Sequence, residues 1–277
     1  MTQPSQHAHV QGPGGGPQQQ ARIEAMKRSW QQKKRIGDHL KRIKNKIAVY
    51  SGKGGVGKST IAVNLAVLLA ERGTAVGILD ADIDCPNLLK IFKSDSEPAM
   101  VDGRIIPAIM HGVKVVSMGS FQEHEEEAII FRGPMIHNSL TQFVELTDWG
   151  ELDFLFIDMP PGTSDAALTV MQTLQLDGFI VVTTPQELAV LDATRSINMI
   201  KKLNIAVLGV VENMTGDIFG TGGGAGLAKR IDAPFLGAIA LRGSFREPDK
   251  PVSLIDSEVR AEFQTILDRL PVPVPIS

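Results

Sequence analysis

The sequence predicts an α/β protein built on a single doubly wound, mainly parallel sheet with helices on both faces. From Ile47 onward, short apolar runs alternate with amphipathic helical stretches. Most of the apolar runs lack the polar alternation of a strand that has one face in water. Parallel strands need crossover connections, and right-handed crossovers place helices on both faces of a sheet. A chain of 277 residues is long enough to bury a sizeable core in such a fold.

The expected strands are apolar runs, and the expected helices are the amphipathic stretches between them. We expect strands at 47–50, 75–79, 113–116, 154–157, 179–182, 206–211 and 235–239. We expect helices at about 60–72, 134–147, 165–175, 187–203, 223–231 and 257–269. Ligands of doubly wound sheets bind at the carboxyl ends of the strands. The loops expected to carry function therefore begin after Tyr50, Leu79, Ile157 and Val211.

The first 46 residues differ in composition from the rest of the chain. Residues 1–20 are mostly Gln, Gly and Pro, which predicts a disordered tail. Residues 21–46 contain ten basic and two acidic side chains and show the apolar spacing of a helix, which we expect Gly37 to interrupt. This basic helical arm carries a charge of +8, so residues 47–277, the predicted folded domain, carry −11. Such an arm can contact nucleic acid or anionic lipid, or lie as a solvated helix on its own acidic domain.

The composition excludes several classes of protein. Hydrophobic residues make up 43% and charged residues 21% of the chain, as in ordinary globular proteins. No stretch approaches the roughly 18 apolar residues of a membrane span, and residues 1–20 lack the apolar segment of a signal peptide. We therefore expect a cytoplasmic protein without membrane insertion. Because Cys85 is the single cysteine, an intrachain disulfide is excluded, as is a metal site made only of one chain's thiolates.

The loop after the first predicted strand carries the strongest functional signal. Residues 52–60 match G-x-x-x-x-G-K-[ST] between a strand and a helix. The glycines let backbone N–H groups converge on phosphate oxygens at a helix N-terminus. Lys58 would reach the β- and γ-phosphates of ATP, and the Ser59 hydroxyl would bind Mg²⁺. The predicted ATP-binding residues of this loop are Gly52, Lys53, Gly54, Gly55, Val56, Gly57, Lys58, Ser59 and Thr60.

Carboxylates that follow two other strands complete the predicted site. Asp158 ends an apolar strand, which is how P-loop nucleotidases present an aspartate to Mg²⁺ and its waters. Asp80 and Asp82 follow the second strand and are expected beside the same metal ion. Asp82 is our candidate for orienting or deprotonating the attacking water. The predicted Mg²⁺ ligands are Ser59, Asp82 and Asp158.

The chain resembles the Mrp (ApbC) family of P-loop ATPases, within the MinD/ParA-like class. The resemblance rests on residues 51–60, 79–83, 131–134, 149–153, 158–163, 211–214 and 218–220. It implies a homodimer with ATP held between the protomers and a role in assembling or carrying iron–sulfur clusters. Mg²⁺ with ATP and a [4Fe–4S] cluster are the implied cofactors, and an iron–sulfur client or scaffold protein is the implied partner.

The resemblance also implies roles for two residues. It places Asn213 at the adenine, where a carboxamide can pair with the donor and acceptor edge of a purine. Lys53 resembles a lysine that, in this class, crosses the dimer interface to the partner's nucleotide. A second cation supplied in trans would stabilise the transition state as an arginine finger does. We therefore predict Lys53, Lys58 and Asp82 as catalytic residues of a slow ATPase that depends on dimerisation or on a partner.

The sequence departs from the family where the cluster ligands are expected. The family has a Cys-x-x-Cys pair shortly after segment 211–214, whereas residues 214–219 read Met-Thr-Gly-Asp-Ile-Phe. A dimer offers only two Cys85 thiolates, fewer than the usual four ligands of a cluster. We identify no iron–sulfur ligand set, and Cys85 is only a weak candidate.

Two functions are therefore expected as alternatives. The first is an ATPase of iron–sulfur biogenesis, either a carrier in an unusual mode or a subunit that drives another protein holding the cluster. The second is a MinD/ParA-like ATPase that positions or regulates a partner, with a nucleic-acid contact through residues 21–46.

Overall fold

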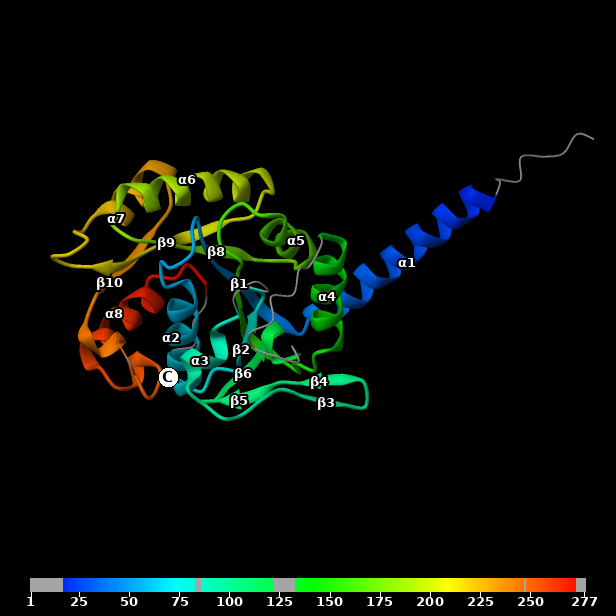
Figure 1. Cartoon of the computed structure of the whole chain (residues 1–277), viewed down its shortest axis with the longest axis horizontal. Coiled ribbons are helices and arrows are strands. Elements are labelled where there is room, and N and C mark those ends of the chain that lie inside the picture. Colours follow the sequence, from blue (N-terminus) through cyan, green and yellow to red (C-terminus); the bar gives the residue numbers. More distant parts are fainter. Residues whose placement is uncertain (1–16, 83–85, 122–132, 247, 273–277) are drawn as a thin grey trace, which may run out of the picture.

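The computed structural model describes residues 17–82, 86–121, 133–246 and 248–272 (Figure 1). Its centre is an eight-stranded sheet with the strand order β10-β9-β8-β1-β7-β2-β6-β5. The strands are β1 (Ile43–Ser51), β2 (Val76–Asp80), β5 (Ala108–Met110), β6 (Val113–Ser117), β7 (Leu152–Asp158), β8 (Gly178–Thr183), β9 (Val207–Thr215) and β10 (Phe235–Ala240).

Every neighbouring pair in this sheet is parallel except β5 and β6, which are antiparallel. The prediction of a doubly wound, mainly parallel sheet is therefore confirmed. The register places Asp158 of β7 opposite Val49 of β1 and opposite Asp80 of β2. Because these strands run in the same direction, their carboxyl ends meet at one edge of the sheet.

Helices cover both faces of the sheet (Figure 1). They are α1 (Pro17–Leu40), α2 (Lys58–Glu71), α3 (Leu88–Phe92), α4 (Gly133–Leu146), α5 (Asp165–Thr173), α6 (Glu187–Lys202), α7 (Gly223–Ile231) and α8 (Ser257–Asp268). One apolar cluster joins α2 and α8 to the sheet, and the other joins the end of α1 to α4, α5, α6 and α7.

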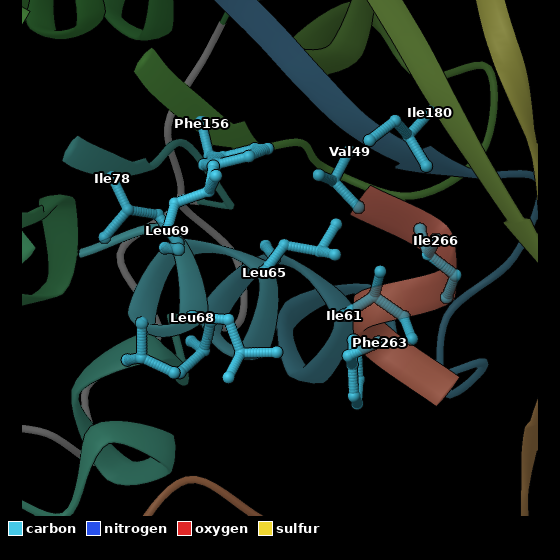
Figure 2. Close-up of a cluster of buried hydrophobic side chains, with 14 of the residues drawn as sticks. Val49, Ile61, Leu65, Leu68, Leu69, Ile78, Phe156, Ile180, Phe263 and Ile266 are labelled. Atoms are coloured by element: carbon cyan, nitrogen blue, oxygen red, sulfur yellow. The ribbon is translucent and has the colours of Figure 1, made fainter. Parts of the chain in front are cut away.

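The cluster between α2, α8 and the sheet fixes the position of the helix that follows the phosphate loop (Figure 2). Ile61 and Leu65 of α2 pack with Phe263 of α8, and all three are fully buried. Val49 and Phe156 from the sheet belong to the same cluster. The continuous apolar sequence of α2 follows from this position, because a helix covered on several sides needs few polar residues.

Small elements at one edge of the sheet are absent from the sequence prediction. The hairpin of β3 (Ala99–Val101) and β4 (Arg104–Ile106), strand β5 and helix α3 are three to five residues long. Short elements give no resolvable periodicity. The sequence did contain one indication of the hairpin, the dipeptide Asp102-Gly103, since Asp-Gly favours tight hairpin turns. Both residues have positive φ in the β3–β4 turn. The remaining 3₁₀ segments are η1 (Met118–Phe121), η2 (Gly243–Phe245) and η3 (Val252–Leu254).

The N-terminal elements differ from the expectation in two ways. Helix α1 already begins at Pro17, and β1 begins at Ile43, so residues 43–46 belong to the sheet. The expected interruption at Gly37 is wrong, because α1 continues through it to Leu40. Gly37 is buried, and a Cβ there would make an ordinary contact of 3.4 Å with Gln175 Nε2, so its surroundings do not require glycine. No helix in the described ranges is long and apolar enough to cross a membrane.

Candidate functional site

The phosphate loop joins β1 to α2 and is fixed by one left-handed glycine and one close backbone approach. Gly57, which precedes α2, has φ 86°, a left-handed conformation that favours glycine. Gly52 packs on α6, where an added Cβ would lie 2.1 Å from the carbonyl carbon of Asp192. The Ser51 hydroxyl donates a hydrogen bond of 2.9 Å to the Lys53 carbonyl. The glycines that suit the loop for phosphate thus also allow it to lie against its neighbours.

Lys58 is the centre of the site. Its Nζ lies 2.7 Å from Asp158 Oδ1 and 3.6 Å from Asp82 Oδ2. The Ser59 Oγ is 3.5 Å from the same nitrogen. Lys58 and Asp82 are each 7% exposed, and Asp158 is 1% exposed. The structure therefore brings together side chains from α2, from β7 and from the segment after β2, as the sequence predicts.

The two carboxylates at the ends of β2 and β7 have raised pKa values. Burial and, to a smaller extent, the negative charge of Asp158 raise the pKa of Asp80 to about 8, and Lys58 opposes the shift. Burial also raises the pKa of Asp158, against the opposing effect of the Lys58 ammonium. Desolvation is thus the main cause at both positions, and Lys58 is the cation that compensates for the buried negative charge.

Asp80 lies behind the pocket, whereas the sequence suggested a place beside the metal ion. It is fully buried and does not line the pocket. Its Oδ1 accepts a hydrogen bond of 3.1 Å from the Asp82 N–H. Its Oδ2 accepts bonds from the Leu88 N–H at 3.3 Å and from the Ser117 hydroxyl at 3.1 Å. One carboxylate therefore holds both ends of segment 82–88, and Asp80 is a positioning residue behind the site.

A pocket of about 490 Å³ opens in front of these groups. It is lined by Ser51, Gly54, Gly55, Gly57, Lys58, Ser59, Thr60, Asp82, Asn87, Ile91, Pro160, Pro161 and Ser164. A second pocket of about 270 Å³ shares Thr60, Asn87 and Ile91 with it and extends along α2 toward Phe245 and Val252. The volume of the first pocket is in the range of small-molecule and cofactor sites.

Sequence reasoning missed several lining residues. Asn87 and Ile91 come from α3 and the residue before it, and Ser164 precedes α5. Ser164 had a detectable signal, because serine favours the N-cap position, and its Oγ accepts a hydrogen bond of 3.3 Å from the Ala167 N–H. The five residues of α3 are too few to be distinguished by periodicity.

The remaining predicted site residues are Lys53, Asn213 and Cys85. Lys53 is half-buried and makes no ion pair with any residue in the described ranges. Asn213 Nδ2 donates a hydrogen bond of 2.8 Å to the Val56 carbonyl, so this side chain braces the phosphate loop. Asn213 does not line the first pocket, and its contact with adenine stays a prediction. Cys85 lies outside the described residues.

The donor set at the pocket fits Mg²⁺ bound together with a nucleotide. Asp158 Oδ2 is buried and makes no hydrogen bond within the described part of the chain. Ser59 and Asp82 line the pocket beside it. Mg²⁺ is usually held by one or two carboxylates together with substrate phosphates and waters. Accordingly, the described residues contain no group of three or more His, Cys, Asp or Glu side chains that would bind a metal alone.

Comparisons with known proteins agree with this geometry. The model of the ParA family described as NUBPL iron-transfer P-loop NTPase matches residues 42–271. The iron–sulfur cluster carrier protein of Methanocaldococcus jannaschii is 43% identical over 256 residues, which cover 87% of this chain and 88% of that protein. The carrier protein of Pyrococcus abyssi is 42% identical over 85% of this chain and 88% of its own length.

Solved structures give the same result. A nucleotide-binding protein from Archaeoglobus fulgidus in complex with ADP is 34% identical, with a TM-score of 0.66 over 87% of this chain and 94% of that chain. The cell-division ATPase MinD of Pyrococcus furiosus is 24% identical, with a TM-score of 0.65 over 81% of this chain and 97% of its own. The likeness to MinD supports the fold alone.

Proposed function

The chain belongs to the NUBPL iron-transfer family of P-loop NTPases, and on that premise we propose that it is an ATP-hydrolysing dimeric switch that serves iron–sulfur cluster assembly. One observation carries the proposal. A buried lysine at the start of α2 lies between two carboxylates, at 2.7 and 3.6 Å, in a pocket lined by the glycine-rich loop. Phosphate oxygens of ATP would replace these carboxylates as partners of Lys58.

The residues of the pocket suit phosphoryl transfer to water. The N–H groups of residues 54–60 would bind the phosphates, and Lys58 would stabilise the charge on the γ-phosphate oxygens. Asp82 would orient the attacking water or take its proton as the bond to the departing ADP breaks. Ser59, Asp82 and Asp158 would hold Mg²⁺, which when bound neutralises charge on the β- and γ-phosphates.

Lys53 belongs to the same proposal as the residue supplied in trans. Its position at the start of the loop and its lack of an ion pair within the described ranges leave its ammonium available to a partner subunit. Hydrolysis would then need a homodimer, which makes the ATPase slow and dependent on assembly. A cytoplasmic location is part of the same proposal.

The cluster itself is the cargo of this function. Relatives with 42–43% identity are iron–sulfur cluster carrier proteins. This chain contains one cysteine, so a homodimer has two thiolates where a cluster usually has four ligands. We therefore assign to this chain the ATP-driven step and to a client or scaffold protein the remaining ligands.

Two variants and their mixture test the proposed ATPase. Lys58→Ala should lose ATP binding, and Lys53→Ala should bind ATP normally but lose hydrolysis. Mixed in equal amounts, the two inactive proteins should recover about a quarter of the wild-type rate, because half of the dimers are mixed and each of these has one complete site. Calorimetric titration of nucleotide and phosphate release measure the two properties separately.

The control is Lys229→Ala, which removes an exposed lysine of α7 away from the pocket. This variant should bind and hydrolyse ATP like the wild type. Wild-type hydrolysis by Lys53→Ala, or no recovery in the mixture, would show that Lys53 does not act in trans. Undiminished ATP binding by Lys58→Ala would contradict the assignment of the site.

A further inference from the structure

Helix α1 carries exposed apolar side chains on the part that projects from the domain (Figure 1). Ile23 is 47% exposed, Met26 73% and Trp30 65%. At the other end of the same helix, Ile36 and Leu40 are buried in the core. The domain therefore anchors α1 by its last turns and leaves the three apolar side chains of the projecting part in solvent.

These side chains form one narrow stripe with cations along both edges. Ile23, Met26 and Trp30 have the spacing i, i+3 and i+7 of a single helix face. Lys27 and Lys34 follow one edge, at i+4 and i+11 from Ile23, and the Lys34 ammonium lies 5.6 Å from the centre of the Trp30 ring. Arg22, four residues before Met26, lies on the opposite edge. All three cationic residues are exposed.

We propose that this face of α1 docks on an anionic lipid surface. The stripe of Ile23, Met26 and Trp30 would enter the boundary between headgroups and acyl chains, and the flanking cations would bind lipid phosphates. Tryptophan and lysine are both suited to this level of a bilayer, since each combines an apolar body with a polar end. The helix would lie along the membrane and would not cross it.

The apolar stripe favours lipid over nucleic acid. A nucleic-acid backbone offers phosphates to the cations but gives no apolar surface on which to bury Ile23 and Met26. Lipid headgroups offer the same charge with an apolar layer directly beneath. The narrow stripe has little apolar area, so the cations and the stripe are both needed for binding.

The acidic domain works against this contact. Residues 47–277 carry a charge of −11, which an anionic membrane repels. Residues 21–46 carry +8, so the part of the chain that contacts the lipid surface is itself attracted to it. Salt screens both effects.

The chain contains a built-in fluorescent probe for this contact. It has two tryptophans, Trp30 on the stripe and Trp149, which is 1% exposed in the core. We expect the full chain to co-sediment with vesicles of phosphatidylglycerol and phosphatidylcholine, and the fluorescence emission of Trp30 to shift to the blue. Both effects should be lost at high salt and with vesicles of phosphatidylcholine alone. Met26→Gln should weaken binding about tenfold.

The matched control is Met100→Gln, the same change at a methionine that is 54% exposed on β3. It should bind vesicles like the wild type, and both variants should melt at the wild-type temperature. The proposal fails if the wild type does not bind anionic vesicles at low salt, or if Met26→Gln binds as well as the wild type. It also fails if only duplex DNA, or only a higher protein concentration, shifts the Trp30 emission. Because no nucleotide is added, the result is independent of the ATPase tests.

Discussion

At the scale of single residues, the carboxylates behind the phosphate loop combine two requirements. Asp82 lines the pocket and Asp158 holds the Lys58 ammonium, whereas Asp80 must hold the backbone that presents Asp82. Asp80 does so from a fully buried position with hydrogen bonds to two backbone N–H groups and to Ser117. A neutral form of Asp80 avoids a second buried negative charge beside Asp158, which agrees with its raised pKa.

Titration of Asp80 should make stability depend on pH in the absence of nucleotide. Its pKa is about 8 in the folded protein against an ordinary 3.8, so the folded state binds the extra proton between these values. The stabilising contribution is complete below pH 4 and is lost as the pH rises to about 8, at up to about 1.4 kcal/mol per pH unit. Urea unfolding of the wild type and of Asp80→Asn at pH 5 to 9 measures this difference.

The comparison of the two proteins isolates the effect from other titrating groups. The stability difference between wild type and Asp80→Asn should shrink or change sign as the pH rises, and become constant above about pH 8. Asp102→Asn makes the same change in the exposed turn between β3 and β4 and is the matched control. A pH-independent difference for Asp80→Asn would rule out the assigned titration.

At the scale of elements, the sequence predicted the long buried strands and missed the short edge elements. Strands β1, β7 and β9 are seven to nine residues long and apolar where they cross the core. Their apolar runs are therefore recognisable in the sequence even where single residues are polar. Helix α3 is set by packing at the rim of the site, and the β3–β4 hairpin lies outside the pocket lining. Single-sequence patterns do not contain such contacts, which is why Asn87 and Ile91 were absent from the predicted site.

Helix α7 offers a test of packing between two elements. Glu212 at the end of β9 accepts hydrogen bonds of 3.0 Å from the Gly222 and Gly224 N–H groups at the start of α7. A Cβ at Gly224 would lie 2.7 Å from Glu212 Cβ, whereas a Cβ at Gly226 would have no atom within 4 Å. Gly224→Ala should therefore cost about 1–3 kcal/mol. Gly226→Ala should stabilise by about 0.5–1 kcal/mol, because alanine favours a helix interior.

Urea unfolding of both α7 variants at one pH measures the two changes. The opposite signs within one helix separate the close contact from general helix propensity. Equal effects of the two substitutions would show that Glu212 moves aside without loss of stability.

At the scale of the whole molecule, the sequence predicted where the site would form, because the carboxyl ends of parallel strands meet at one edge. Lys58, Asp82 and Asp158 do converge there, although the catalytic and metal-binding roles assigned to them stay predictions. The direction of the Asn213 side chain could not be predicted from the sequence, because its hydrogen bond to Val56 joins residues 157 positions apart. The way in which α1 divides into an anchored and a projecting part also depended on contacts with the other helices.

This division of α1 predicts unequal effects of two truncations. Removing residues 1–34 deletes the projecting part and should leave the melting temperature within about 2 °C, because Ile23, Met26 and Trp30 are exposed there. Removing residues 1–41 also deletes Ile36 and Leu40, which are 4% and 1% exposed. Burial of two such side chains contributes about 3–6 kcal/mol, so we expect a drop of about 10 °C or more. Calorimetry of both proteins decides the matter, and equal melting temperatures would show that α1 is not anchored by these two residues.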